Sequence, residues 1–217
     1  MKSIGQRGHR AMMAANKIAY HLSRAITEKG AASLIVSGGS SPLAIFKALT
    51  TIKIDWAKVT ISLVDDRDVP ADHADSNELL LKTHLFNGEI ASANFISLAR
   101  NPDNVAGIAR PFDVMLLGMG TDGHFASLFP DMISDEAAFA LGAAPTILRT
   151  GIKGSPAHPR ITMNLAMILQ SSHIFLLVNG AAKTAVLAEA QHNHDFPIAA
   201  LLQQKITNIE IIMDSPS

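Results

Sequence analysis

Apolar and polar residues follow one another along this chain in the two periods that distinguish helices from strands. Residues 33–36, Ser-Leu-Ile-Val, form a short, mainly apolar run of the kind found in buried strands. Before it, segment 6–29 has helical spacing and ends at Gly30, a common helix terminator. Its apolar positions are Met12, Ala15, Ile18, Ala19, Leu22 and Ile26. The chain is therefore predicted to begin with a long helix followed by a strand.

The same succession continues to the end of the sequence. Further strands are predicted at 59–64, 95–98, 112–117, 146–149, 174–178 and 209–213. Further helices are predicted at 42–49, 77–86, 164–169 and 181–191, with Ser76 as an N-cap. Alternating strands and helices favour an α/β fold, a three-layer αβα arrangement with a mostly parallel, Rossmann-like sheet and helices on both faces. No repeat, low-complexity segment or linker interrupts the pattern, so residues 1–217 are expected to form one domain.

Composition and charge restrict the classes of protein to which this chain can belong. Hydrophobic residues make up 48% of the 217 residues and charged residues 17%, which is typical of a globular chain with a sizeable core. The net charge of −1 and the lack of a basic block argue against nucleic acid or an anionic membrane as partner. The chain has no cysteine, which excludes disulfides and thiolate zinc sites and fits a cytoplasmic protein.

Two segments bear on membranes and secretion. The N-terminal residues lack the apolar core of a signal peptide. Segment 161–182 has no Asp, Glu, Lys or Arg, but it contains several polar residues and divides into a helix-like and a strand-like half. We therefore expect no membrane-spanning helix there.

The loop at 37–42 reads Ser-Gly-Gly-Ser-Ser-Pro and lies between a predicted strand and a predicted helix. Glycines expose backbone N–H groups, hydroxyls add donors, and a helix N-terminus favours an anion. The loop matches neither the Walker pattern nor the dinucleotide pattern. A phosphate site and an ordinary tight turn remain equally open on this evidence.

The loop at 65–70 places Arg67 among three carboxylates, those of Asp65, Asp66 and Asp68. One interpretation is a solvated acidic turn with a local ion pair, which contributes little at a surface. The other is that the guanidinium of Arg67 binds phosphate, whose oxygens it matches in pairs.

The loop at 118–130 is the most informative segment. It follows the predicted strand 112–117, and its glycines allow a sharp turn that contains Asp122 and His124. Open α/β proteins build their sites beyond the carboxyl ends of the strands, and a histidine there can act as a base near neutral pH. An isolated Asp-Gly-His would more often be a solvated turn. Two further cations are candidates for the same pocket: Arg160, expected just before a helix, and Lys183, in the first turn of a helix.

Five ordered motifs together resemble one family. They are Ser-Gly-Gly-Ser-Ser-Pro at 37–42, Asp-Asp-Arg-x-Val-Pro at 65–70 with Ser-Asn at 76–77, Gly-x-Gly-x-Asp-Gly-His-x-Ala-Ser-Leu-Phe-Pro at 118–130, Arg-Ile-Thr at 160–162 and Gly-x-x-Lys at 180–183. This set is similar to the 6-phosphogluconolactonases, whose family is shared with glucosamine-6-phosphate deaminases. The chain departs from the usual pattern at Asp66, where Glu is common, at Asp68, where an aromatic residue is common, and at His158, in a segment that is commonly rich in Lys and Pro.

The resemblance implies roles for particular residues. It implies hydrolysis of 6-phospho-D-glucono-1,5-lactone in the pentose phosphate pathway, with His124 activating water and Asp122 assisting. Whether Asp122 orients the imidazole or binds sugar hydroxyls is left open. The phosphate would be held by Gly38, Gly39, Ser40 and Arg67, with Arg160 and Lys183 as further anion contacts. No serine nucleophile elbow or metal-ligand cluster is apparent in the sequence, so no metal and no cofactor are expected.

Two other functions remain open. A deaminase-type isomerase would use Asp65 as a base, but such relatives continue after the Asp-Gly-His loop with Asn-Glu-Pro, where this chain has Ser127 to Pro130. A non-catalytic sugar-phosphate-binding module would need the phosphate loops but not His124. Turnover assays separate these possibilities.

Overall fold

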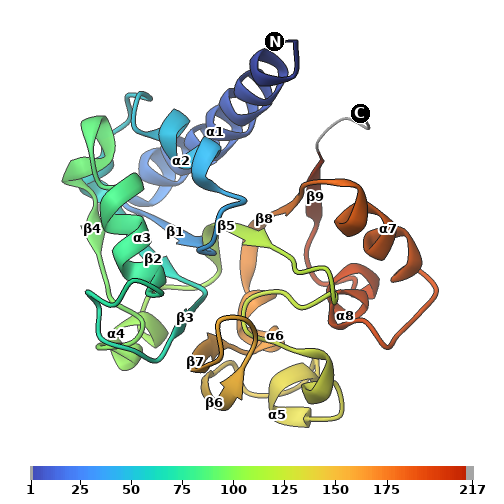
Figure 1. Cartoon of the computed structure of the whole chain (residues 1–217). Coiled ribbons are helices and arrows are strands. Elements are labelled where there is room, and N and C mark those ends of the chain that lie inside the picture. Colours follow the sequence, from blue (N-terminus) through green and yellow to red (C-terminus); the bar gives the residue numbers. More distant parts are fainter. Residues whose placement is uncertain (1, 214–217) are drawn as a thin grey trace.

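The computed structural model describes residues 2–213, with side chains from residue 8 onward, and its central element is a six-stranded sheet (Figure 1). All neighbouring strands in this sheet are parallel. The strand order is β4 (Asn94–Phe95), β2 (Val59–Leu63), β1 (Ala32–Val36), β5 (Phe112–Gly118), β8 (Ser171–Val178) and β9 (Ile209–Met213). The predicted three-layer α/β fold with a mostly parallel sheet is confirmed.

The strands are buried because helices cover the sheet. Every residue of β1 is buried, as are the first six of β5, which explains why both read as mainly apolar runs. The helices are α1 (Lys2–Lys29), α2 (Leu43–Leu49), α3 (Asn77–His84), α4 (Pro102–Ala106), α5 (Glu136–Phe139), α6 (Leu165–Ile168), α7 (Ala181–Glu189) and α8 (Pro197–Gln203). Short 3-10 turns occur at Trp56–Lys58, Gly88–Ser92 and Pro130–Met132.

The long helix α1 packs on β1 and β5 through one face. Its buried residues recur three or four positions apart, and five of them are alanines, which let the helix axis lie close to the sheet. They are Ala11, Ala14, Ala15, Ile18, Ala19, Leu22 and Ala25. At its end, the Lys29 Nζ lies 2.5 Å from Asp113 Oδ1, and Asp113 also accepts a hydrogen bond from the Ser33 backbone N–H. These contacts tie the helix to the amino-terminal ends of β1 and β5.

A second, antiparallel sheet was not predicted. It consists of β3 (Asp65–Arg67), β7 (His158–Met163) and β6 (Ile147–Lys153), in that order. The sequence predicts a loop at 65–70 and places Arg160 just before a helix, but β3 and Arg160 are both part of this sheet. The pairing joins residues more than ninety positions apart, for example Asp65 with Thr162, and local periodicity carries no signal for it.

Other differences are smaller. The strand predicted at 95–98 is reduced to Asn94–Phe95, and the one predicted at 146–149 extends to Lys153 within the second sheet. Helices α4, α5 and α8 were missed because each spans at most two turns, too few for a clear period. Segment 161–182 forms the end of β7, then α6 and β8. Among residues 2–213, no helix combines the length and the apolar character needed to cross a membrane.

Candidate functional site

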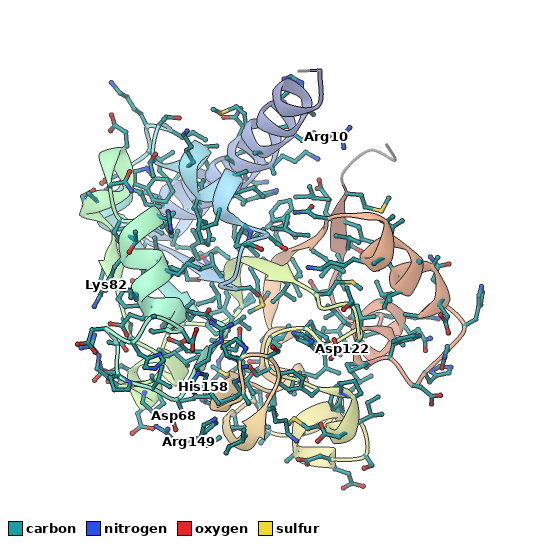
Figure 2. All side chains as sticks on the ribbon, in the orientation of Figure 1. Arg10, Asp68, Lys82, Asp122, Arg149 and His158 are labelled. Atoms are coloured by element: carbon teal, nitrogen blue, oxygen red, sulfur yellow. The ribbon has the colours of Figure 1, made fainter. Side chains whose placement is uncertain are left out.

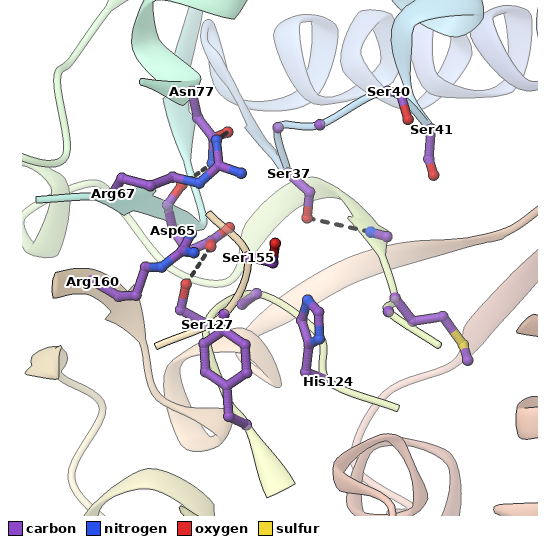
Figure 3. A pocket seen from close by; sticks show the side chains of 18 of the residues that line it. Ser37, Ser40, Ser41, Asp65, Arg67, Asn77, His124, Ser127, Ser155 and Arg160 are labelled. Carbon is purple, nitrogen blue, oxygen red and sulfur yellow. Dashed lines mark hydrogen bonds between the residues drawn. The ribbon is translucent and has the colours of Figure 1, made fainter. Parts of the chain in front are cut away.

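The loops that follow β1, β5 and β8 meet the second sheet around a cavity of about 260 Å³ (Figure 3). Because the strands are parallel, their carboxyl ends lie at one edge of the sheet, and the three loops converge there. Seven of the predicted site residues line the cavity. The eighth, Asp122, contacts the lining residue His124. The lining residues are Gly38, Gly39, Ser40, Arg67, His124, Arg160 and Lys183, together with Ser37, Ser41, Asp65, Asn77, Gly118, Met119, Gly120, Ala126, Ser127, Phe129, Gly154 and Ser155.

His124 and Asp122 are in direct contact. The Nδ1 of His124 lies 2.5 Å from Asp122 Oδ1, and the same oxygen accepts the His124 backbone N–H at 3.2 Å. The hydrogen bond from His124 lowers the pKa of Asp122 below its usual value, so Asp122 is a carboxylate and accepts from Nδ1–H. This contact assigns the proton to Nδ1 and leaves Nε2 as the nitrogen with a free lone pair. The two side chains are therefore in contact, as an Asp122 that orients the imidazole requires.

The imidazole lies directly against the backbone of Gly120. A Cβ at position 120 would lie 2.3 Å from Nδ1 and Cε1 of His124 and 2.5 Å from Asp122 Oδ1. On its other side, the ring of His124 stacks at a tilt on Phe129, with 4.7 Å between ring centroids. Glycine is therefore required at position 120 by the position of the His–Asp pair.

The loop at 37–42 has a tight packing contact of its own. A Cβ at Gly38 would lie 2.1 Å from Asn77 Oδ1, and Gly39 has a φ of +81°. Among the residues described, the backbone N–H groups of Gly38, Gly39 and Ser40 donate to no protein acceptor. The Ser37 hydroxyl instead accepts from the Gly118 N–H at 3.3 Å and so links the loops after β1 and β5 (Figure 3). The loop thus offers a row of free donors to the cavity.

A cation stands on each side of this loop. Arg67 Nη1 donates to Asn77 Oδ1 at 3.0 Å and to the Asp75 carbonyl at 2.6 Å. Its Nε is buried and has no hydrogen-bond partner among the described residues. At the other side, the Lys183 Nζ lies 3.3 Å from the Ser41 hydroxyl, and burial lowers the pKa of Lys183. A buried donor without a partner is costly, so Arg67 is suited to a bound anion.

Arg160 is more constrained than the sequence suggested. It lies on β7 and is almost fully buried. Its Nε and Nη2 donate to the Lys153 carbonyl at 3.1 and 2.9 Å, and Nη2 also donates to the Pro156 carbonyl at 2.7 Å. These bonds hold the loop that brings Gly154 and Ser155 to the cavity. Most of its donors are therefore occupied, although the residue lines the cavity.

Asp65 is a buried carboxyl group in the cavity wall. Its Oδ2 accepts from the Ser127 hydroxyl at 2.6 Å (Figure 3). Burial raises the pKa of Asp65, while the Ser127 hydrogen bond and the nearby Arg67 act in the opposite direction. The sequence singles out Asp65 only as the base of a rival reaction, and its pairing with Ser127, 62 residues away, could not be read there.

Asp66 and Asp68, the two residues of the loop at 65–70 that differ from the usual family pattern, have structural roles. The carboxylate of Asp66 accepts backbone N–H groups of Asn77 at 2.6 Å, Glu78 at 3.1 Å and Arg67 at 2.7 Å, and so fixes the start of α3. Burial raises its pKa to about 6 against the effect of these bonds. Asp68 forms an ion pair with Arg149 on β6. Neither side chain lines the cavity.

One group of three side chains in the described structure lies close enough to share a metal ion. It consists of His73, Asp75 and His158 and does not line the cavity. The sequence showed no such cluster because His158 is 83 residues away from Asp75.

Comparisons with known proteins agree with this architecture. Residues 6–210 match the family model described as glucosamine-6-phosphate isomerases/6-phosphogluconolactonase. A 6-phosphogluconolactonase of Pseudomonas putida is 38% identical over 205 residues, which cover 88% of this chain and 84% of that one. One from Neisseria meningitidis is 36% identical and covers 93% of both.

A solved structure gives the same result in three dimensions. The crystal structure of a 6-phosphogluconolactonase from Shewanella baltica superposes with a TM-score of 0.85 at 35% identity, covering 95% of this chain and 94% of the other. The resemblance that the five motifs indicated therefore extends over the whole fold. The chain belongs to the glucosamine-6-phosphate isomerase/6-phosphogluconolactonase family.

Proposed function

We propose that this chain hydrolyses 6-phospho-D-glucono-1,5-lactone to 6-phosphogluconate, the lactonase step of the pentose phosphate pathway, with water activated by His124. The observation that carries the proposal is the His124–Asp122 pair, which lies at the edge of a cavity flanked by Arg67 and Lys183. The names of the similar proteins support the same reaction class.

The His–Asp pair supplies the proton transfers that lactone hydrolysis needs. Asp122 accepts from Nδ1–H, so Nε2 of His124 is free to take a proton from water as the water oxygen attacks the lactone carbonyl carbon. The bond from that carbon to the ring oxygen then breaks, and the ring oxygen takes the proton from the imidazolium to become a hydroxyl. Asp122 stabilises the imidazolium between the two steps.

The remaining cavity residues bind and orient the substrate. The free N–H groups of the loop at 37–42, together with Ser40 and Arg67, are proposed to hold the phosphate, with Lys183 and Arg160 as further positive charges. Two of these cations approach the loop from opposite sides, which restricts where a dianion lies. A fixed phosphate places the lactone ring relative to His124 and so lowers the entropic part of the barrier.

A parallel assay of two reactions tests the proposal. Lactone hydrolysis and ammonia release from glucosamine 6-phosphate are measured on the same preparation, with spontaneous hydrolysis subtracted. The proposal expects turnover of the lactone alone. Ammonia release would indicate the deaminase-type reaction with Asp65 as base, and no turnover of either substrate would indicate a binding module.

Gly120→Ala is expected to lower kcat for the lactone by at least about tenfold, because small displacements of catalytic groups are costly. The added Cβ occupies the space of the His124 ring, so the imidazole must shift. The measurement is steady-state kinetics with thermal unfolding as a check on folding. Gly142→Ala, where no atom lies within 4 Å of the added Cβ, is the matched control. Full activity of folded Gly120→Ala would contradict the placement of His124.

Lactone hydrolysis is expected to fall as the pH decreases from about 8 to 5, because a protonated imidazole accepts no proton; ordinary histidines titrate near about pH 6.5. The pKa of Asp122 is lowered, so Asp122 stays ionised throughout this range and does not cause the fall. The pKa of Asp65 is raised, so a fall in activity caused by protonation of Asp65 would also lie nearer neutral pH than for an ordinary carboxyl group. The pH at which activity falls therefore does not show whether His124 or Asp65 is the titrating group. A variant at position 124 does show it. An acid limb that persists unchanged in His124→Asn would assign the titration to a group other than His124.

A further inference from the structure

Three potential metal ligands meet at the second sheet, and none of them lines the cavity. His73 and Asp75 belong to the segment between β3 and α3. His158, which is labelled in Figure 2, is the first residue of β7. Asp75 Oδ2 lies 2.8 Å from His158 Nε2 and 3.9 Å from His73 Nδ1. The three ligand atoms all lie within 4.8 Å of one another, so one ion can be reached by all three after small side-chain rotations.

Hydrogen bonds of the three side chains show what a metal ion would replace. His73 Nδ1 accepts the Asp75 backbone N–H at 3.1 Å, so this nitrogen carries a lone pair. A metal ion would take the place of the proton between His158 Nε2 and Asp75 Oδ2, because histidine binds metals through an unprotonated nitrogen. The rings of His73 and His158 are nearly perpendicular, at 78°, with centroids 5.3 Å apart, and both approach the same carboxylate.

We propose that His73, Asp75 and His158 form a binding site for a divalent transition-metal ion, with Zn²⁺ as the expected occupant. Two imidazole nitrogens and one carboxylate oxygen suit Zn²⁺, and they exclude neither Co²⁺ nor Ni²⁺ as substitutes. Side-chain exposures of 40% for His73 and 36% for Asp75 leave room for water at the fourth position. The site joins two segments that are far apart in sequence, as a structural metal does.

The site is connected to the cavity through Arg67. The carbonyl of Asp75 accepts from Arg67 Nη1 at 2.6 Å, and Arg67 pairs with Arg160 across β3 and β7. An ion that bridges Asp75 and His158 holds the Asp75 backbone against β7 and thereby fixes the guanidinium of Arg67. Metal binding is thus expected to favour phosphate binding, a consequence that rests on the proposed function of Arg67.

Metal binding is tested without substrate. Tag-free protein is treated with EDTA, dialysed, and titrated with ZnCl₂ by calorimetry and with CoCl₂ by visible absorption. Wild type is expected to bind one equivalent of Zn²⁺ that His73→Gln and His158→Gln bind at least about tenfold more weakly, since even outer-shell changes cost 10–100-fold in affinity. Two variants serve as controls: His192→Gln, an exposed histidine elsewhere, and His124→Asn, which removes the other His–Asp contact. Both controls are expected to retain the site.

Two results would overturn the proposal: wild type that binds no Zn²⁺ at micromolar concentrations, or binding that is equal in wild type and in both ligand variants. Circular dichroism verifies folding, and His73 is exposed enough for its variant to fold. The link to Arg67 is tested separately, by measuring KM for the phosphorylated lactone with and without Zn²⁺. Coupling between sites predicts a KM at least about fivefold lower with Zn²⁺ at unchanged kcat. An inactive protein that still binds Zn²⁺ through these residues would refute the proposed function and leave the metal site intact.

Discussion

Replacing His124 by alanine is expected to lower kcat for lactone hydrolysis by about a hundredfold or more, the usual effect of removing a positioned base. The side chain is one-third exposed and packs on Phe129 at the cavity edge, so its loss removes little of the core. The variant is therefore expected to unfold at nearly the same temperature as wild type. The measurement is initial rates under saturating lactone, corrected for the spontaneous reaction.

His192→Ala provides the control for this experiment, because His192 is an exposed histidine near the end of α7 that does not line the cavity. It is expected to retain wild-type kinetics. A folded His124→Ala enzyme with wild-type kcat would refute the role of His124, whatever the substrate proves to be.

Replacing Arg67 by alanine is expected to raise KM for the phosphorylated lactone by about tenfold or more. Hydrogen bonds to charged groups contribute about 1.5–3 kcal/mol, and each 1.4 kcal/mol is a factor of ten in affinity. The buried Nε of Arg67 has no partner among the described residues, so its binding capacity is available to a ligand. The preference for phosphorylated over unphosphorylated gluconolactone is expected to shrink by the same factor.

Arg67 also supports the structure, since it donates to Asp75 and Asn77. Arg67→Lys serves as the matched variant because it keeps the positive charge but loses the planar guanidinium group, which can bind two phosphate oxygens at once. It is expected to show a KM between those of wild type and Arg67→Ala. If the preference between the two lactones is the same in Arg67→Ala as in wild type, Arg67 does not bind the phosphate.

The inner strands of the main sheet could be predicted from the sequence because they are buried. Runs such as 33–36 and 112–117 are apolar except for Ser33 and Asp113, and helices of recognisable period separate them. Since parallel strands place their carboxyl ends together, the order of strands and loops along the chain is enough to assign the loops at 37–42 and 118–130 to one site. Both loops line the cavity.

The pairing of β3 with β7 could not be predicted, because β3 is short and its partner lies more than ninety residues away. β3 has only three residues, two of them acidic, and its pattern is that of a turn. Its partner β7 supplies Arg160, whose place on a strand and whose bonds to Lys153 and Pro156 depend on that pairing. Contacts such as Ser127 with Asp65 and Arg67 with Asn77 were hidden for the same reason.

The two sheets divide the cavity between them in a way that bears on how such proteins diverge. The proposed proton-transfer pair, Asp122 and His124, comes from a loop of the parallel sheet, whereas Arg67, Arg160 and the segment at 154–155 come from the antiparallel one. The hairpin of β6 and β7 joins the rest of the fold through β3 alone as a strand partner. Within this hairpin, Thr162 accepts the Ser127 backbone N–H at 3.2 Å, and Arg160 lies over the ring of Phe129, which packs on His124. Substitutions in residues 147–163 that keep these two contacts are therefore expected to change the lining of the cavity while the His–Asp pair stays in place.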